Sequence, residues 1–287
     1  MVKIAIIGDI HRHFNAGDVT TFNRSTYDLI LITGDLADFR STDAISVADK
    51  LAQLQKRAIF IAGNHDCTNL TQFIAEIKGI DWLAQVSSAG QDKRVAKLRR
   101  HLGAVTFGAY SCHNFTINEQ DFSIIAARPF SPGGPELRFR PYLSQNYGVN
   151  SLEDSAQRLR ELIDGAGSET LIFLAHNGPV GFGSEKDDIW GCDFRDEGGD
   201  YGDPDLYEAI RYAKEQGKRV AAVVAGHMHH ELKDGGKRQW LVQAEGTTYI
   251  NAARVPRIFE RHGEIVHHHL SMTLDKGEVV VEEVLAH

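Results

Sequence analysis

Five short motifs rich in aspartate, asparagine and histidine each follow a short apolar run of the sequence. They are Gly8-Asp9-Ile10-His11, Gly34-Asp35, Gly63-Asn64-His65-Asp66, Ala175-His176-Asn177-Gly178 and Gly226-His227-Met228-His229. Ligands of open α/β sheets bind beyond the carboxyl ends of the strands, so we expect these motifs to converge on one site. The candidate ligands offer oxygen and nitrogen but no thiolate, which favours Mn, Fe or Zn over a cysteine-rich structural zinc site.

The elements that must position these motifs follow from the apolar runs. Short runs at residues 3–7, 29–33, 58–62, 170–175 and 219–225 are typical of buried strands. Helical patterns at 43–56 and near 152–163, and a helix that Asp203 and Pro204 should start, alternate with them. This alternation predicts an α/β fold with largely parallel strands. Residues 240–244, 247–252, 265–274 and 278–284 predict an antiparallel tail that forms a second sheet.

Each motif has a simpler explanation when it is taken alone. A Gly-Asp pair after a strand is commonly a turn, and Asn-His-Asp commonly caps a following helix. The alternation of side chains along a strand places both imidazoles of His-x-His on one face, yet such pairs are often incidental surface histidines. The occurrence of all five motifs after apolar runs is what indicates a common site.

The order Asp-x-His, Gly-Asp, Gly-Asn-His-Asp, His and Gly-His-x-His, which runs over residues 9–229, resembles the calcineurin-like metallophosphoesterase superfamily. The resemblance implies a single α/β domain over residues 1–287, with two mixed β-sheets packed as a sandwich and flanked by helices in four layers, αββα. It also implies two divalent metal ions. The implied ligands are Asp9, His11 and His229 for the first metal, Asn64, His176 and His227 for the second, and Asp35 as the bridge between them.

This ligand set implies a reaction. Only a carboxylate has two oxygens that can hold a metal pair about 3.5–4 Å apart, and a water shared by two cations has its pKa lowered toward about 7. We therefore expect hydrolysis of a small phosphate mono- or diester with a metal-bridging hydroxide as the nucleophile. The alternative is a binding or scaffold protein that keeps the fold without turnover. Proteins of that kind typically lose ligands, and this sequence retains all seven.

His65 and Asp66 are the candidate catalytic residues beside the metals. In the family's pattern, the histidine next to the metal-binding asparagine faces the phosphate, stabilises transition-state charge and protonates the leaving oxygen. Asp66 would fix the tautomer of His65 and raise its pKa. The alternative is that Asp66 only caps the helix that follows, and both readings stay open at this stage.

The substrate class is only partly constrained by the sequence. Protein phosphatases of this superfamily usually carry an arginine in the second motif and end the third in glutamate, whereas Asp66 stands here. Residues 128–134 and 190–203 resemble a little-characterised group in cyanobacteria and plastids. Arg254 and Arg128 are candidate phosphate contacts, because a guanidinium can bind two phosphate oxygens. The alternative for both arginines is a position at the rim, facing water.

Composition sets further expectations. A net charge of -8 over 287 residues argues against a nucleic-acid partner, which needs a basic face. Three widely spaced cysteines suit a reducing compartment, and no apolar run approaches the length of about 18 residues that spans a bilayer. We therefore expect a cytoplasmic protein with no membrane partner. The oligomeric state is left open.

Residues 181–203 form a long segment rich in glycine and aspartate that lies between two ligand motifs. It carries Trp190, Phe194 and Tyr201, and long loops inside a compact domain are uncommon unless they are functional or disordered. We expect a lid over the metal pair that supplies an aromatic contact and admits only small substrates. The alternative is a surface loop packed away from the site.

Overall fold

The first of two sheets contains the N-terminal strands. The computed structural model describes residues 1–39, 41–194 and 199–287, with only the backbone at residue 41. Strands β1 (Val2–Ile7), β2 (Leu29–Ile32), β3 (Arg57–Ile61) and β4 (Thr106–Gly108) are parallel neighbours. On the other side of β1, β12 (Glu264–Asp275) pairs antiparallel and is flanked by β11 (Ile258–Arg261) and β13 (Glu278–Ala286).

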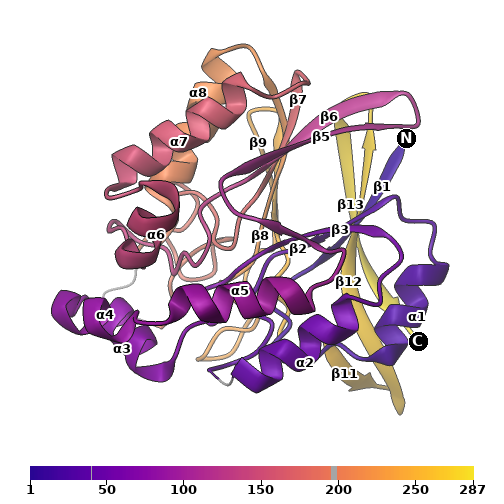
Figure 1. Ribbon diagram of the computed structural model, residues 1–287. Helices are drawn as coiled ribbons and strands as arrows, with labels where there is room; N and C mark the ends of the chain where they lie inside the picture. Colours follow the sequence, from indigo (N-terminus) through magenta and orange to yellow (C-terminus); the bar gives the residue numbers. More distant parts are fainter. Residues whose placement is uncertain (40, 195–198) are drawn as a thin grey trace.

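The second sheet is also mixed. Strands β6 (Gln120–Ala126), β7 (Thr170–Leu174), β8 (Arg219–Ala225) and β10 (Thr247–Asn251) run parallel in its centre. The antiparallel strands β5 (Ser111–Ile117) and β9 (Leu241–Ala244) form its two edges. Each sheet therefore presents several parallel strands whose carboxyl ends point toward one edge of the molecule (Figure 1).

Alternation along the strands builds the layers. Ile4, Ile6, Leu31 and Ile59 of the first sheet pack in one buried cluster with Ile172 and other residues of the second sheet. The residues between them in sequence, such as Ala5 and Ile30, face the helices instead. Successive side chains of a strand point to opposite faces, so strands that are apolar at every position are buried on both sides.

Eight helices complete the described part of the chain. Helices α7 (Leu152–Asp164) and α8 (Pro204–Glu215) pack together and contact strands of the second sheet, and α2 (Ser41–Leu51) packs against α5 (Gln91–His101). Figure 1 shows these two helix pairs on different sides of the molecule. The remaining helices are α1 (Ala16–Arg24), α3 (Leu70–Lys78), α4 (Asp81–Ser87) and α6 (Arg140–Tyr147). Two mixed sheets flanked by helices are the predicted fold.

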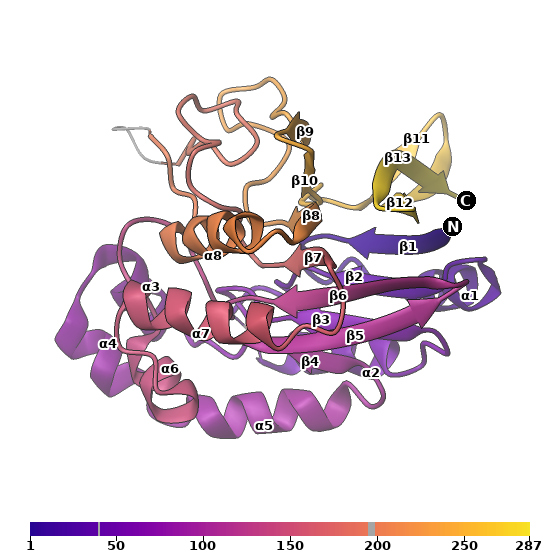
Figure 2. The same ribbon diagram turned by 90° about the horizontal axis from the view of Figure 1, so that it is seen from above.

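The sequence located the five site-bearing strands to within one or two residues but misplaced the tail. The tail does not form the second sheet on its own, because β11, β12 and β13 join the first sheet beside β1 (Figure 2). Of the tail, only β9 and β10 join the second sheet, whose other edge strand is β5. The sequence analysis predicts no strand in residues 106–126, which contain β4, β5 and β6. The antiparallel pairing expected of the tail is confirmed, because β9 pairs antiparallel with β10 and β12 pairs antiparallel with β13. The expectation that all four strands form the second sheet is wrong, because apolar alternation identifies a strand but not the sheet that it joins.

None of the described helices is both long and apolar enough to cross a membrane. None of Cys67, Cys112 and Cys192 forms a disulfide. The single-domain organisation over residues 1–287 stays a prediction.

Buried histidines make the fold sensitive to acid. His269 of β12 is 3% exposed, and its Nε2 lies 2.9 Å from the hydroxyl oxygen of Tyr27. Burial, followed by the nearby Arg257, lowers the pKa of His269 from 6.5 to about 4. Between these two pH values the unfolded chain binds a proton that the folded chain does not, so folding stability falls as the pH falls.

We predict that His269 contributes a loss of about 3 kcal/mol of unfolding free energy between pH 6.5 and pH 4. Replacing it with Gln removes the titrating group, so chemical denaturation across this range should show a shallower pH dependence in His269→Gln than in the wild type. His262→Gln, at an exposed position, is the matched control and should follow the wild type. An unchanged pH dependence of stability in His269→Gln would contradict the contribution of His269 to acid sensitivity.

Candidate metal centre

The seven candidate ligands all follow strand ends, but the strands belong to both sheets. Asp9 and His11 follow β1, Asp35 follows β2 and Asn64 follows β3, all in the first sheet. The other three candidates follow strands of the second sheet; they are His176 after β7, and His227 and His229 after β8. The site therefore lies where the carboxyl ends of the parallel strands of one sheet meet those of the other sheet.

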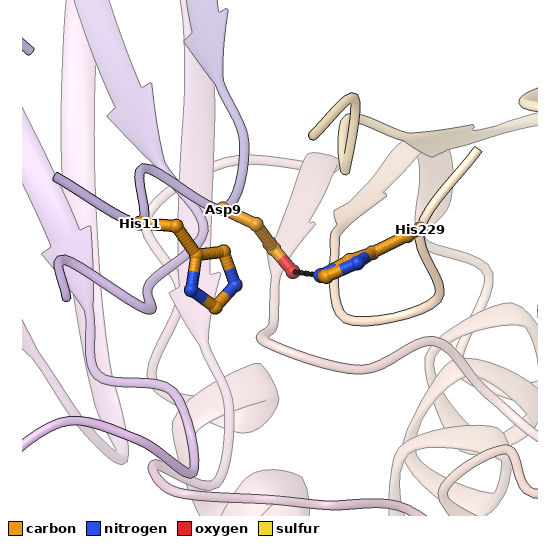
Figure 3. A group of neighbouring side chains, drawn as sticks. All are labelled: Asp9, His11 and His229. Atoms are coloured by element: carbon orange, nitrogen blue, oxygen red, sulfur yellow. Dashed lines mark ion pairs between the residues drawn. The ribbon is translucent and has the colours of Figure 1, made fainter. Parts of the chain in front are cut away.

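The first group of donors is Asp9, His11 and His229. One potential ligand atom from each residue lies within 4.8 Å of the other two. Figure 3 shows the Asp9 carboxylate between the two imidazoles, with Oδ2 at 3.6 Å from His229 Nε2. Asp9 is fully buried, and both of its oxygens accept the backbone N–H of His227, at 3.2 and 2.9 Å. This contact joins Asp9, which follows a strand of the first sheet, to His227, which follows a strand of the second sheet, and holds the carboxylate in place.

The second group of donors is Asp35, His176 and His227, whose ligand atoms also lie within 4.8 Å of one another. Asn64 belongs to this group by position, because its Oδ1 lies 2.9 Å from His176 Nε2. His176 Nδ1 donates to the carbonyl oxygen of Thr33 at 2.6 Å, which leaves the Nε2 lone pair directed at the site.

Asp35 lies between the two groups. Its Oδ2 is 3.8 Å from His11 Nε2 and 3.6 Å from His176 Nε2, so one carboxylate reaches a histidine of each group. Its Oδ1 accepts the backbone N–H of His65 at 3.0 Å. Burial alone would raise the pKa of Asp35, but the surrounding His176, His65 and His11 outweigh burial and hold the pKa well below its usual value.

The donor set fits two divalent cations. The buried Nε2 atoms of His11 and His227 have no hydrogen-bond partner, and an unpaired buried polar atom is costly unless something binds it. Asp9 and Asp35 supply two negative charges, and the five other ligands are neutral. Two divalent ions would leave the cluster at +2, a charge that attracts a phosphate oxyanion.

The backbone around the site is close-packed and strained. A Cβ atom at Gly226 would overlap Oδ1 of Asp9, and a Cβ atom at Gly63 would overlap Oδ1 of Asp35. The ligand residues His11, Asp35 and His227 have φ values of 38°, 47° and 68°, in the left-handed region that non-glycine residues rarely adopt. Such strain persists where the surrounding structure enforces it, and it clusters at functional sites.

Asp38 is a residue of the site that the sequence analysis missed. Its Oδ1 accepts a hydrogen bond from His11 Nδ1 at 3.1 Å, which directs Nε2 toward Asp35. Arg12 pairs with the other carboxylate oxygen of Asp38 at 3.3 Å. Carboxylates in this position orient metal-binding histidines and set their tautomer. The available signal was the second acid in Gly34-Asp35-Leu36-Ala37-Asp38.

His65 packs against aromatic rings, and a carboxylate oxygen of Asp38 lies within 4.8 Å of one of its ring nitrogens. The rings of Phe39 and Phe73 lie 4.6 and 4.8 Å from the His65 ring, and its buried Nδ1 has no hydrogen-bond partner. Burial lowers the pKa of His65, and Asp35 only partly counteracts this.

The expected pairing of Asp66 with His65 is absent from the structure. The Asp66 carboxylate accepts the backbone N–H groups of Leu36 and Gly63, both at 2.9 Å. It does not cap the following helix either, because the N-cap of α3 is Asn69. Asp66 instead joins the second and third motifs, a positioning role that adjacency to His65 in sequence could not reveal.

Both candidate arginines form ion pairs with carboxylates of the chain. Arg128 is 2% exposed and pairs with Asp203 at 3.0 Å and with Asp205 at 2.9 Å. The rim position facing water is therefore wrong for Arg128. Its Nη1 is buried without a hydrogen-bond partner, and its role toward the substrate stays a prediction. Arg254 pairs with Glu283 at 3.0 Å, and its guanidinium lies 4.3 Å from the ring centre of Phe259.

The described part of segment 181–203 is anchored, and residues 195–198 lie outside the described part of the chain. Trp190 is fully buried, so it does not supply the aromatic contact expected of this segment. Arg238 donates hydrogen bonds to the carbonyl oxygens of Lys186, Asp188 and Gly191 and to the carboxylate of Asp193. These contacts hold residues 186–193 in place. We call residues 186–194 the wall of the pocket, because Asp193 and Phe194 line it.

A pocket of ≈ 260 Å³ opens at the metal centre. Its lining includes the ligand residues Asp35, Asn64, His227 and His229 together with His65. Phe194 of the 181–203 segment also lines it, with its ring 6.3 Å from that of His227. A larger hollow of ≈ 760 Å³ between α3, α4, α6 and α7 contains none of the candidate ligands.

Two mixed sheets between helices, and two groups of nitrogen and oxygen donors with one carboxylate between them, are the characteristic features of metallophosphoesterases. The sequence model of the family described as calcineurin-like phosphoesterase matches residues 2–231, and the chain belongs to this family. No curated protein matches the chain in sequence.

Solved structures show similar folds. A dimetal phosphatase from Danio rerio superposes with a TM-score of 0.55 at 14% identity, covering 99% of this chain and 98% of that chain. At this identity the similarity shows the fold alone. A metallophosphoesterase from Sphaerobacter thermophilus has 14% identity, covering 100% of this chain and 90% of that chain. Its TM-score of 0.35 is too low to support a structural comparison.

We predict that Asp38→Ala weakens metal binding by the first donor group about 10- to 100-fold, because His11 loses the acceptor that orients its ring. Titration of the apo-protein with Mn²⁺, followed by calorimetry, measures the effect. Asp38→Asn keeps an acceptor oxygen and should recover most of the affinity.

Asp49→Ala is the matched control, because it removes a carboxylate that lies 2.7 Å from His101 Nδ1, a histidine outside the donor groups. Equal metal affinities for Asp38→Ala and Asp49→Ala would remove Asp38 from the site.

Proposed function

We propose that this chain is a metal-dependent hydrolase of small phosphate mono- or diesters. The observation that supports it most is the position of Asp35, whose carboxylate reaches His11 of one donor group and His176 of the other. When bound, two divalent ions there would supply positive charge for the phosphoryl oxygens and lower the pKa of a water molecule. Asp9, His11 and His229 would hold the first ion, and Asn64, His176 and His227 the second.

The chain's own residues would orient the ester and stabilise its charge. His65 lines the pocket beside the ligands, and its imidazole can donate a hydrogen bond to a phosphoryl oxygen or to the leaving oxygen. Asp66 and Asp38 keep the second motif and His11 in place through the hydrogen bonds described above. The pocket volume of ≈ 260 Å³ suits a small organic group rather than a polymer.

The alternative is a scaffold protein of the same fold. A scaffold has no need for a complete, buried donor set or for strained ligand backbones. The seven ligands and His65 all face one edge here, and the φ values at His11, Asp35 and His227 are costly to maintain. These features favour the hydrolase.

Asp35→Asn should abolish hydrolysis and lower the metal content from two ions per chain to one or none, because a neutral amide cannot screen two adjacent cations. Elemental analysis of protein purified with excess Mn²⁺, Fe²⁺ or Zn²⁺, combined with a screen of phosphomonoesters and diesters, tests this. Asp121→Asn, at an exposed position on β6, should behave as the wild type. Wild-type protein that binds fewer than two ions under these conditions would refute the proposal.

His65→Ala should retain both metals and lose about 10²–10⁴-fold in kcat on esters of poorly acidic alcohols. The loss should be smaller for esters with good leaving groups, which need less help from a proton donor. Steady-state kinetics across a series of leaving groups, with metal content measured on the same samples, distinguishes this role from site assembly. Unchanged turnover on the poorest leaving group would exclude His65 from the reaction.

A further inference from the structure

The pocket at the metal centre has an apolar side in addition to its ligand side. Eight residues line it besides the ligands and His65, and five of these are apolar. The five are Phe73, Ile77, Pro132, Phe194 and Met228. A phosphate group needs none of these side chains, so they indicate what binds beyond the phosphate.

Phe73 reaches the pocket from helix α3. Its ring lies 4.8 Å from the His65 ring and 4.7 Å from the Phe39 ring, so its position is fixed by packing. Phe73 remains partly exposed where it lines the pocket. The phenyl ring of Phe73 is therefore available immediately next to His65, the residue that would face the phosphate.

Phe194 reaches the same pocket from the segment between β7 and β8. It is 38% exposed, and its ring lies 6.3 Å from the His227 ring. Its neighbour Asp193 is held by the Arg238 guanidinium at 3.1 Å and by the backbone N–H of Lys233 at 3.0 Å. The chain thus holds an aromatic side chain at the mouth of the pocket instead of burying it.

The charges of the lining set the polarity of the group that fits. Apart from the metal ligands and His65, the lining carries two carboxylates, Asp193 and Glu231, against one cation, Lys233. Lys233 Nζ lies 5.8 Å from the centre of the Phe194 ring. This balance disfavours a second anionic group in the organic portion of the substrate.

We propose that the pocket binds an uncharged aromatic ring in the alcohol portion of the phosphate ester, with Phe73 and Phe194 as its contacts. The inference rests on the proposed function for the phosphate end of the substrate. Aromatic pairs gain stabilisation from ring geometry beyond the burial of apolar area, so an aromatic group binds more tightly here than an aliphatic ring of the same size.

The test compares benzylphosphonate with cyclohexylmethylphosphonate, two non-hydrolysable ligands that share the phosphonate and the size of the ring. Calorimetry on the Mn²⁺-loaded protein should show about 3- to 10-fold tighter binding of benzylphosphonate. Phe194→Leu and Phe73→Leu keep an apolar side chain and should each bring this ratio close to one. Phe115→Leu, on the distant edge strand β5, is the matched control and should keep the wild-type ratio.

Equal affinities of the two phosphonates for the wild type, or a ratio that survives in both pocket variants, would overturn the inference. Hydrolysis of benzyl phosphate and cyclohexylmethyl phosphate is measured in parallel. Preferential binding of benzylphosphonate without hydrolysis of these two esters or of any ester in the screen of phosphomonoesters and diesters would support the ring site and contradict the proposed function, so the two failures are distinguishable.

Discussion

The Asp35 carboxylate is buried between His11, which follows a strand of the first sheet, and His176, which follows a strand of the second. A buried charge is tolerated only when opposite charge or hydrogen bonds surround it, so the two sheets must meet with their carboxyl ends in register at this point. The hydrogen bond from His176 to the Thr33 carbonyl and those from the His227 backbone to Asp9 join the same two edges. The donor groups are thus consequences of how the sandwich closes.

Buried ionic contacts further from the metals support this edge. Arg128 joins the segment after β6 to Asp203 and Asp205 at the start of α8, and Ser131 also donates to Asp203 at 2.6 Å. Truncating one member of such a network would leave an uncompensated charge, so each network defines one arrangement of its loops. The contacts of Arg238 with residues 186–193 have the same effect on the segment that precedes Phe194. The wall that carries Phe194 is therefore built into the fold.

The sequence allowed the α/β class, the site-bearing strands and the seven ligand candidates to be predicted, because short apolar runs followed by polar motifs depend on local patterning. It did not allow contacts that depend on strand partners or side-chain direction to be predicted. Asp203 was expected to cap α8 and occupies the N-cap position, but its carboxylate binds Arg128 and Ser131 instead of the helix N–H groups. Asp66 and Trp190 likewise act through contacts distant in sequence, which no spacing rule specifies.

The most direct test of the account is a crystal structure of the Mn²⁺-loaded protein with anomalous diffraction at the manganese edge. The account predicts two anomalous peaks about 3.5–4 Å apart, one among Asp9, His11 and His229 and the other among Asn64, His176 and His227, with Asp35 in contact with both. A single peak, or peaks outside these two donor groups, would contradict it.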